Sequence, residues 1–181
     1  SGKGLEFLSR LALPQPDQMI LEDLLESYRE GEKHLQKTDD IVKKLHEELD
    51  DARRIDTVPG FAPTLSVLVA VEIGEIDRFE SAAHLQAYAG VIPTTHSSGG
   101  RTYHGRITKA GNPWLRWAAL EAVFLATQAS LEIRGLYSRL ARRKNPNVAK
   151  VAVARRLLAI IYRLLKEKRD YIRDMNHPSV A

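Results

Sequence analysis

The segment from residue 88 to 116 contains side-chain types that could hold and attack a phosphate group. Ser97 and Ser98 carry hydroxyl groups, and Gly99-Gly100 follows them directly. Asn112-Pro113 predicts the start of a helix, whose free N–H groups favour an anion. The segment has no Asp or Glu, and its cations are Arg101, Arg106, Lys109 and Arg116. We therefore expect a phosphate-binding site here, with a serine as the candidate nucleophile.

A serine hydroxyl is a weak nucleophile at neutral pH and needs a base, a metal ion or both. His96 and His104 flank the serines and are candidate bases. Two plainer interpretations remain open, because loop histidines are commonly solvated and Ser-Gly is ordinary turn composition.

Two further groups of side chains each allow two interpretations. Tyr103, Trp114 and Trp117 could stack on unpaired bases, or the tryptophans could be half-buried helix residues. Glu72 and Asp77 could form a metal pair, or they could belong to a solvated helix end, since no third ligand is close in the sequence.

Residues 91–111 form the serine loop. They lack a 3.6-residue period and are rich in Gly, Ser and Thr, which predicts a loop or a small β-hairpin. Helical patterns surround this segment, and N-caps are expected at Ser81, Asn112 and Asn145.

A helical core is expected over residues 112–173. Its first helix runs to about Ser130, and a later long helix runs to about Tyr171. The apolar stripe of the first helix is expected at Leu115, Ala118, Ala122, Leu125 and Ala126. Before the long helix, Arg142, Arg143 and Lys144 are candidate phosphate contacts, with a merely charged loop as the alternative.

Residues 55–74 have the pattern of a helix-hairpin-helix, in which a glycine-rich turn presents backbone N–H groups to a phosphate. Gly60 is the candidate phosphate-binding residue. Ala62 replaces the second glycine of the usual pattern and fits only with a negative φ. A purely structural helical hairpin is the alternative.

Residues 17–56 carry apolar side chains at heptad spacing, which predicts a coiled coil, and residues 1–16 are expected to be a linker. Gly31 and Thr38 weaken one seam and leave room for a bend, or for a hairpin turn near Gly31. The functional interpretation is oligomerisation, and the alternative is a helix packed on its own domain. The seams are Leu21, Tyr28, Leu35, Val42 and Leu49, and Leu24, Gly31, Thr38, Leu45 and Ala52.

The net charge of +4 is unevenly distributed. Residues 1–56 hold 9 Lys and Arg against 14 Asp and Glu, whereas residues 57–181 hold 18 against 9. Two long tracts, 81–120 and 133–166, contain no acid. Such tracts favour binding of a polyanion such as nucleic acid over a merely solvated face.

The absence of cysteine excludes a disulfide framework and a thiolate metal site. No apolar run is long enough to cross a bilayer, and the N-terminus does not have the pattern of a signal peptide. We therefore expect a cytoplasmic protein with no membrane partner. The helical patterns described above predict that it is mainly α.

Several short blocks are similar, in the same order, to the C-terminal transposase domain of the IS110 insertion-sequence family, which is related to pilin-inverting recombinases. The similarity begins at about Asp17. Its specific part is Ser-Gly-Gly followed by Gly-Arg-Ile-Thr-Lys-x-Gly-Asn. The blocks are residues 58–63, 72–74, 78–79, 88–93, 98–100, 105–112 and 115–116.

This resemblance implies a C-terminal transposase domain over residues 57–181. It implies that Ser98 forms a covalent link to a DNA 5′ phosphate, with Ser97 as the alternative nucleophile. Arg106, Lys109 and Asn112 would support the loop or contact phosphate, and Arg101 and Arg116 are further candidates.

The resemblance also implies partners outside the chain. Family members carry an N-terminal RuvC-like domain with four metal-binding acids, where Mg²⁺ is expected, so no cofactor is expected in this segment. The chain would then be a fragment, inactive alone, that belongs to a dimer or tetramer in a prokaryotic cytoplasm, acting at the nucleoid. DNA and a guide (bridge) RNA would be its nucleic-acid partners.

Three functions follow from these observations. The first is a part of a DNA transposase or site-specific recombinase that supplies a serine nucleophile. The second is a dimerising DNA- or RNA-binding scaffold without chemistry. The third, an enzyme acting on a small phosphorylated ligand, lacks any recognisable cofactor motif.

Overall fold

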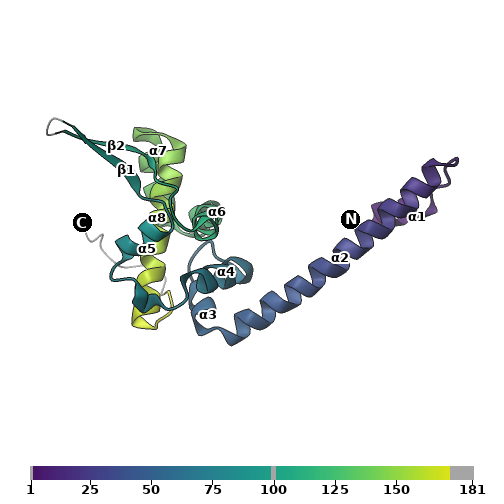
Figure 1. Cartoon of the computed structure of the whole chain (residues 1–181), viewed down its shortest axis with the longest axis horizontal. Helices are drawn as coiled ribbons and strands as arrows, with labels where there is room; N and C mark the ends of the chain where they lie inside the picture. Colours follow the sequence, from purple (N-terminus) through teal and green to yellow (C-terminus); the bar gives the residue numbers. More distant parts are fainter. Residues whose placement is uncertain (1, 99–100, 172–181) are drawn as a thin grey trace. The chain divides into compact units, whose positions relative to one another are not determined.

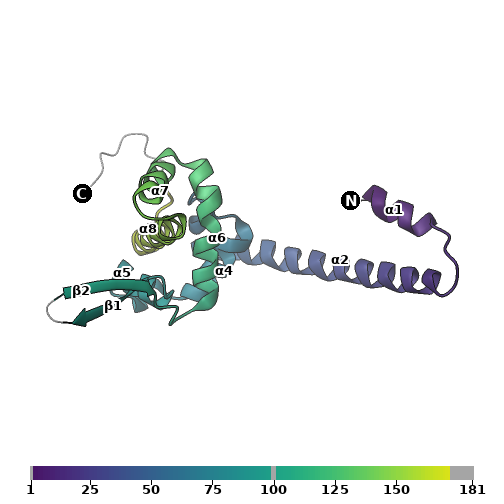
Figure 2. The same ribbon diagram turned by 90° about the horizontal axis from the view of Figure 1, so that it is seen from above.

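The computed structural model describes residues 2–98 and 101–171, and it gives no side-chain detail for residues 95–98 and 101–104. The described part is mainly α-helical with one two-stranded antiparallel sheet, which confirms the predicted fold class (Figures 1 and 2). The chain divides into two compact units, Ser1–Lys43 and Lys44–Ala181. Within the described residues, no helix combines the length and the apolar character that spanning a membrane requires.

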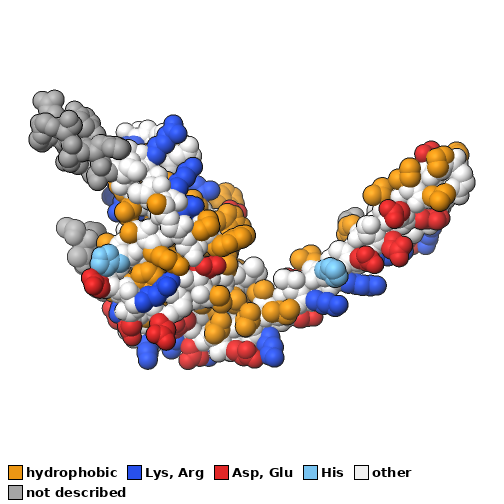
Figure 3. Space-filling view, in the orientation of Figure 1, with side chains coloured by type: hydrophobic (Ala, Val, Ile, Leu, Met, Phe, Trp, Pro, Cys, Tyr) orange, Lys and Arg blue, Asp and Glu red, His pale blue; other side chains and the backbone are white. Residues whose placement is uncertain are grey.

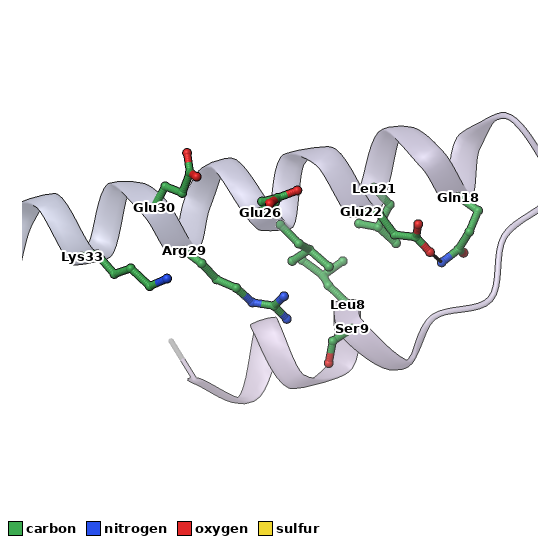
Figure 4. Close-up of a pocket in the computed structure, with 10 residues that line it drawn as sticks. Leu8, Ser9, Gln18, Leu21, Glu22, Glu26, Arg29, Glu30 and Lys33 are labelled. Atoms are coloured by element: carbon green, nitrogen blue, oxygen red, sulfur yellow. Dashed lines mark hydrogen bonds between the residues drawn. The ribbon is translucent and has the colours of Figure 1, made fainter.

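The first unit contains α1 (Gly2–Arg10) and most of α2 (Asp17–Glu48). Leu25 of α2 is buried, and Leu8 and Ser9 of α1 lie along the same groove, whose volume is about 460 Å³ (Figure 4). The groove also contains Gln18, Leu21, Glu22, Glu26, Arg29, Glu30 and Lys33. Because its rim carries both signs of charge, it does not favour an anion.

α2 is one continuous helix, so the bend or hairpin turn for which Gly31 left room does not occur. A single glycine costs only about 1 kcal/mol in a helix interior, which good helix formers on both sides can offset. The break comes instead at Leu49, after which α3 (Asp50–Asp56) begins.

The second unit begins with a helical hairpin of α3 and α4 (Pro63–Ile73), which pack against each other. Ala62 is the N-cap residue of α4, with φ −130°, so its backbone meets the expected condition. Gly74 ends α4 with φ +58°, a conformation that glycine adopts without steric cost. The short 3₁₀ helix η1 (Ile76–Arg78) then leads to α5 (Ala82–Tyr88).

The core of this unit lies around α8 (Pro146–Glu167), which packs against α3, α5, α6 (Pro113–Ala129) and α7 (Leu131–Arg143). The buried face of α6 is rich in alanine, which lets its neighbours approach closely. Leu125 was expected in this face but is exposed, and Ala119 and Val123 are buried instead. The difference arises because α6 is covered by α4 as well as by α7 and α8, which moves the buried face around the helix.

Three helix starts follow the predicted N-cap signals. The side chains of Ser81, Asn112 and Asn145 accept hydrogen bonds from the first-turn N–H groups of α5, α6 and α8. α8 ends at Glu167 rather than near Tyr171, because Lys168 adopts a left-handed conformation and its N–H donates back to Leu165.

The side-chain types on one face of the molecule are drawn in Figure 3. Lys and Arg side chains are visible over the second unit in this view, close to apolar side chains.

Candidate functional site

The serine loop is a β-hairpin, one of the two forms that the sequence allowed. β1 (Pro93–Ser98) pairs antiparallel with β2 (Arg101–Ile107), with a register irregularity between Pro93 and Thr95. The hairpin projects from the helices of its unit (Figure 2). The backbone of Ser98 is paired with Arg101 and that of Ser97 with Thr102, so both candidate nucleophiles lie at the end farthest from the helices. The side chains of Ser97, Ser98 and Arg101, and the whole of Gly99-Gly100, lie outside the described residues.

The two chain segments that enter and leave the hairpin are held together by backbone hydrogen bonds. We call them the hairpin base, residues 88–92 and 107–112. The N–H of Asn112 donates to the carbonyl of Tyr88 at 2.7 Å, and that of Lys109 donates to Gly90 at 3.2 Å. The hairpin therefore begins from a fixed junction between the end of α5 and the start of α6.

Two glycines allow this close approach. A Cβ atom at Gly111, whose φ is +130°, would lie 2.2 Å from the carbonyl oxygen of Tyr88. A Cβ atom at Gly90, whose φ is +67°, would lie 2.8 Å from both the carbonyl oxygen of Ala110 and Nη1 of Arg116. Both positions exclude a larger residue, which explains glycine in these two blocks.

Arg116 is bound to the hairpin base and is not part of an open cationic surface. Its Nη1 donates to the carbonyl oxygens of Ala89 at 3.2 Å and Lys109 at 3.1 Å. These carbonyls come from the two opposite segments of the base, so the half-buried guanidinium joins them.

Asn112 contacts three helices at once. Its Oδ1 accepts from the N–H of Leu115 at 2.9 Å and caps α6. Its Nδ2 donates to Oε2 of Glu72, the carboxylate near the end of α4, at 2.5 Å. The same Nδ2 lies 3.3 Å from the hydroxyl of Tyr88 at the end of α5.

Arg78 completes this cluster. Its guanidinium lies 4.6 Å from the ring centroids of both Phe79 and Tyr88, a cation–π arrangement, and it donates to the carbonyl of Glu72 at 3.1 Å. The hydrogen bond from Asn112, followed by that from Arg78, lowers the pKa of Tyr88 below its ordinary value of 10.0. The cluster therefore links the ends of α4 and α5 to the start of α6.

The other predicted cations whose side chains the structure describes are exposed. Arg106 and Lys109 are exposed on or just after β2, and Lys109 has φ +53°. Arg142, Arg143 and Lys144 are exposed at the end of α7, directly before the N-terminus of α8. This second group therefore lies on a different helix junction from the hairpin.

Gly60 packs against α6. With φ +94°, it would place a Cβ atom 2.3 Å from the carbonyl oxygen of Ala122 and 2.9 Å from the Ala126 side chain. Its backbone therefore lies against another helix, which is a packing reason for glycine at this position.

Trp114 and Trp117 are exposed, by 60% and 49%, rather than half-buried. With Pro113 they line an open hollow of about 350 Å³ at the start of α6. The two indoles therefore offer apolar surface next to the hairpin base.

The described residues contain no group of three or more His, Asp or Glu side chains placed to bind a metal ion. Glu72 and Asp77, considered as a metal pair, have other partners, since Asp77 lies 2.6 Å from Nζ of Lys166. This contact lowers the pKa of Asp77.

Sequence reasoning gave no positioning role to Glu72, Arg78 or Tyr88, although all three lie in the blocks that carried the family resemblance. Their role depends on contacts between distant residues, such as the 40 positions between Glu72 and Asn112. The available signal was that these polar and aromatic residues belong to the same blocks as Asn112.

Comparisons with known proteins agree with the resemblance. The chain is 30% identical over 118 residues to an uncharacterized 43.6 kDa protein of insertion element IS110 from Streptomyces coelicolor, covering 65% of this chain and 29% of that protein. It is 29% identical over 126 residues to the transposase for insertion sequence element IS1111A of Coxiella burnetii, covering 67% and 35%. It is 28% identical over 123 residues to the pilin gene-inverting protein of Moraxella bovis, covering 66% and 38%.

The chain thus spans less than half the length of these relatives. Residues 52–138, which include the helical hairpin, the serine hairpin, its base and α6, match the model of the IS116/IS110/IS902 transposases. Residues 52–138 of this chain therefore form a segment that belongs to the IS116/IS110/IS902 transposase family.

Proposed function

We propose that this chain supplies the serine nucleophile and a nucleic-acid-binding surface of a DNA transposase or site-specific recombinase. The observation that carries the proposal is the serine hairpin itself. Ser98 is paired with Arg101 at the end of a two-stranded projection, whose base is fixed by backbone and side-chain hydrogen bonds within the family-matched residues. Such a projection can reach a phosphate of the DNA backbone while the helical core stays outside the duplex.

The reaction is a transesterification. Oγ of Ser98 forms a bond to phosphorus as the bond from phosphorus to the 3′ oxygen breaks, which leaves a 5′ phosphoserine link and a free 3′ hydroxyl. The serine gives up its proton to a base, and the departing 3′ oxygen gains one. Because the number of phosphate esters is unchanged, a 3′ hydroxyl of another strand can reverse the step and join new ends.

The proposed role of the cations is to neutralise the phosphate. Arg101, Arg106 and Lys109 lie on or just after β2, where no acid is near in the sequence. The positive charges of these side chains would stabilise the extra negative charge of the phosphorane-like transition state more than they stabilise the starting diester. Arg142, Arg143 and Lys144 would contact the backbone farther along the nucleic acid.

The divalent metal ion that the family resemblance implies does not fit the described residues, which hold no suitable ligand cluster. We propose that the full-length protein holds Mg²⁺ in a separate acidic domain. A guide RNA and a dimeric or tetrameric assembly are further proposals, which the resemblance and the exposed heptad face of α2 support.

The test uses the full-length protein with Mg²⁺, its nucleic-acid partners and its DNA junction. After denaturation, a covalent protein–DNA product is isolated and its attachment site is mapped by mass spectrometry. We expect a phosphoserine adduct at Ser98, abolished by S98A and retained by the matched neighbour variant S97A. An adduct at Ser97, or recombination at the wild-type rate by S98A, would refute the assignment.

The second candidate is a nucleic-acid-binding scaffold without chemistry. The exposed apolar face of α2 and the two acid-free tracts favour it. The same experiment separates the two functions, because a scaffold would give salt-sensitive DNA or RNA binding with no adduct in any variant.

A further inference from the structure

We infer that Glu72 and Asn112 form a positioning pair that fixes the direction of the serine hairpin. This inference rests on the proposed function, since it concerns how Ser98 reaches its phosphate. Neither residue is proposed to contact DNA or the reacting atoms.

The first argument is where the pair lies. The serine hairpin is connected to the helical core by two chain segments, one after Tyr88 and one before Asn112. The Asn112 side chain joins α6, through Leu115, to α4, through Glu72, and approaches α5 at the Tyr88 hydroxyl. Three helices therefore meet on one side chain at the point where the hairpin begins.

The second argument is the residue type. A helix N-cap needs only an acceptor, and Asp or Ser serves as well as Asn. Asn112 also uses its amide donor, and it is this donor that contacts the half-buried Glu72 carboxylate. Only a side chain with both an acceptor and a donor can cap α6 and contact Glu72 together. Capping alone therefore does not explain the geometry at this position.

The third argument is the rest of the cluster. Arg78 donates to the backbone carbonyl of Glu72 and lies over the ring of Tyr88, so it joins the end of α4 to the end of α5. Arg116 separately joins the two segments of the base through the carbonyls of Ala89 and Lys109. A fixed Glu72 can thus transmit the orientation of α4 to Asn112.

The hairpin amplifies small errors at its base. From Pro93 to Ser98 the strand extends about 17 Å at the usual rise per residue. A tilt of about 10° at the base would therefore move Ser98 by about 3 Å, whereas a misplacement of about 1 Å can reduce a reaction rate roughly 100-fold. The pair consequently matters for the reaction more than for the stability of the fold.

The test exchanges the donor and the acceptor in the full-length protein. N112D keeps the cap but removes the donor and opposes two carboxylates, so we expect at least a tenfold loss in the rate of adduct formation at Ser98. E72Q keeps an acceptor for Asn112 and is the conservative control, expected within threefold of wild type. In the double variant N112D/E72Q, the amide introduced at position 72 donates to the carboxylate introduced at position 112, and we expect the rate to return to within threefold.

DNA affinity should be alike in all four proteins. Because N112D opposes two carboxylates and should unfold at a lower temperature, the rates are compared at a temperature where all four proteins are folded. A wild-type rate in N112D, or a failure of the double variant to recover, would overturn the inference.

A second measurement does not depend on activity. The chain has no cysteine, so spin labels can be attached through T102C on β2 and K150C on α8, with any cysteine outside this chain replaced by serine. We expect a narrow distance distribution in the wild-type and E72Q backgrounds, a broader or shifted one with N112D, and recovery in the double variant. An unchanged distribution with N112D would refute the positioning pair, whereas a wild-type protein that forms no adduct would refute only the proposed function.

Discussion

A Cβ atom at position 60 would lie 2.3 Å from the carbonyl oxygen of Ala122, so Gly60 is in contact with the backbone of α6. The two residues lie on opposite sides of the serine hairpin in the sequence. Their contact fixes the loop between α3 and α4 against the helix that begins at the hairpin base. The helical hairpin thereby supports the orientation of α4, from which Glu72 reaches Asn112.

We predict that G60A lowers the free energy of unfolding by roughly 2–4 kcal/mol, because it adds backbone strain at positive φ and a clash with α6. Chemical denaturation of the purified chain measures the change. The matched control is G135A in α7, where a Cβ atom meets nothing within 4 Å. The free energy of unfolding of G135A should rise by about 0.5–1 kcal/mol, because alanine has a higher helix propensity than glycine. A fully stable G60A that has lost DNA binding would instead support the phosphate-binding interpretation of Gly60.

The predicted cations should separate into two classes. R116K shortens the fork that joins Ala89 and Lys109, and we predict a loss of about 1–3 kcal/mol in unfolding free energy, because these carbonyls lose their shared donor. Replacing Arg142, Arg143 and Lys144 together by glutamine should leave stability within roughly 0.5 kcal/mol.

DNA binding should show the opposite pattern. The triple variant should reduce the slope of log affinity against log salt by about one unit for each phosphate that is no longer neutralised. R116K, tested at a temperature where it is folded, should keep the wild-type slope. An unchanged slope in the triple variant would mean that these residues form only a charged surface.

Local capping signals in the sequence predicted three helix starts correctly, because a cap acts within three residues. Ser81, Asn112 and Asn145 are all N-caps as expected. The sequence left both a continuous helix and a turn at Gly31 open. α2 is continuous, since the cost of Gly31 is small compared with the helix-forming tendency of its surroundings.

Contacts between distant residues were not predictable in the same way. The hydrogen bonds that Asn112 donates to Glu72 and Gln86 donates to Arg155 join residues 40 and 69 positions apart. No spacing rule in the sequence identifies such pairs. Arg116 was assigned to phosphate binding because it is a cation in a basic segment. Its contacts with the carbonyls of Ala89 and Lys109 depend on the folded arrangement, in which the end of α5 and the segment after β2 lie beside α6.

The chain has two tryptophans, Trp114 and Trp117, and both line the same hollow. We propose an unpaired nucleobase as its occupant, because residues 81–120 contain no acid that would repel a nucleic acid. We predict that single-stranded DNA quenches tryptophan fluorescence and that W114A weakens binding by about 1–3 kcal/mol. The control is F124A, which removes another exposed aromatic residue of α6. Equal losses in both variants, or no quenching, would argue against stacking in the hollow.

Tyr88 should ionise at a lower pH than an ordinary tyrosine, since Asn112 and Arg78 favour its phenolate. The folded chain therefore loses this proton before the unfolded chain does, and the unfolding free energy gains a contribution as pH rises through the folded pKa. That contribution is complete above the unfolded pKa near 10.0. Ultraviolet titration of wild type minus Y88F isolates the group, and N112D should raise its pKa. A Tyr88 that titrates with the other tyrosines would show that Asn112 does not act on the phenol.

The seam of α2 should mediate self-association. Leu24 and Leu35 are exposed by 60% and 62%, and Tyr28 between them is exposed as well, at positions that repeat along one face of the helix. Because a charge in a coiled-coil seam must be buried on pairing, L35E should weaken self-association of the full-length protein at least tenfold, or about 1.4 kcal/mol. Sedimentation equilibrium measures this change, with Q36E as the control that adds the same charge outside the seam. A monomeric wild type, or an L35E protein that associates as tightly as Q36E, would exclude this face as the interface.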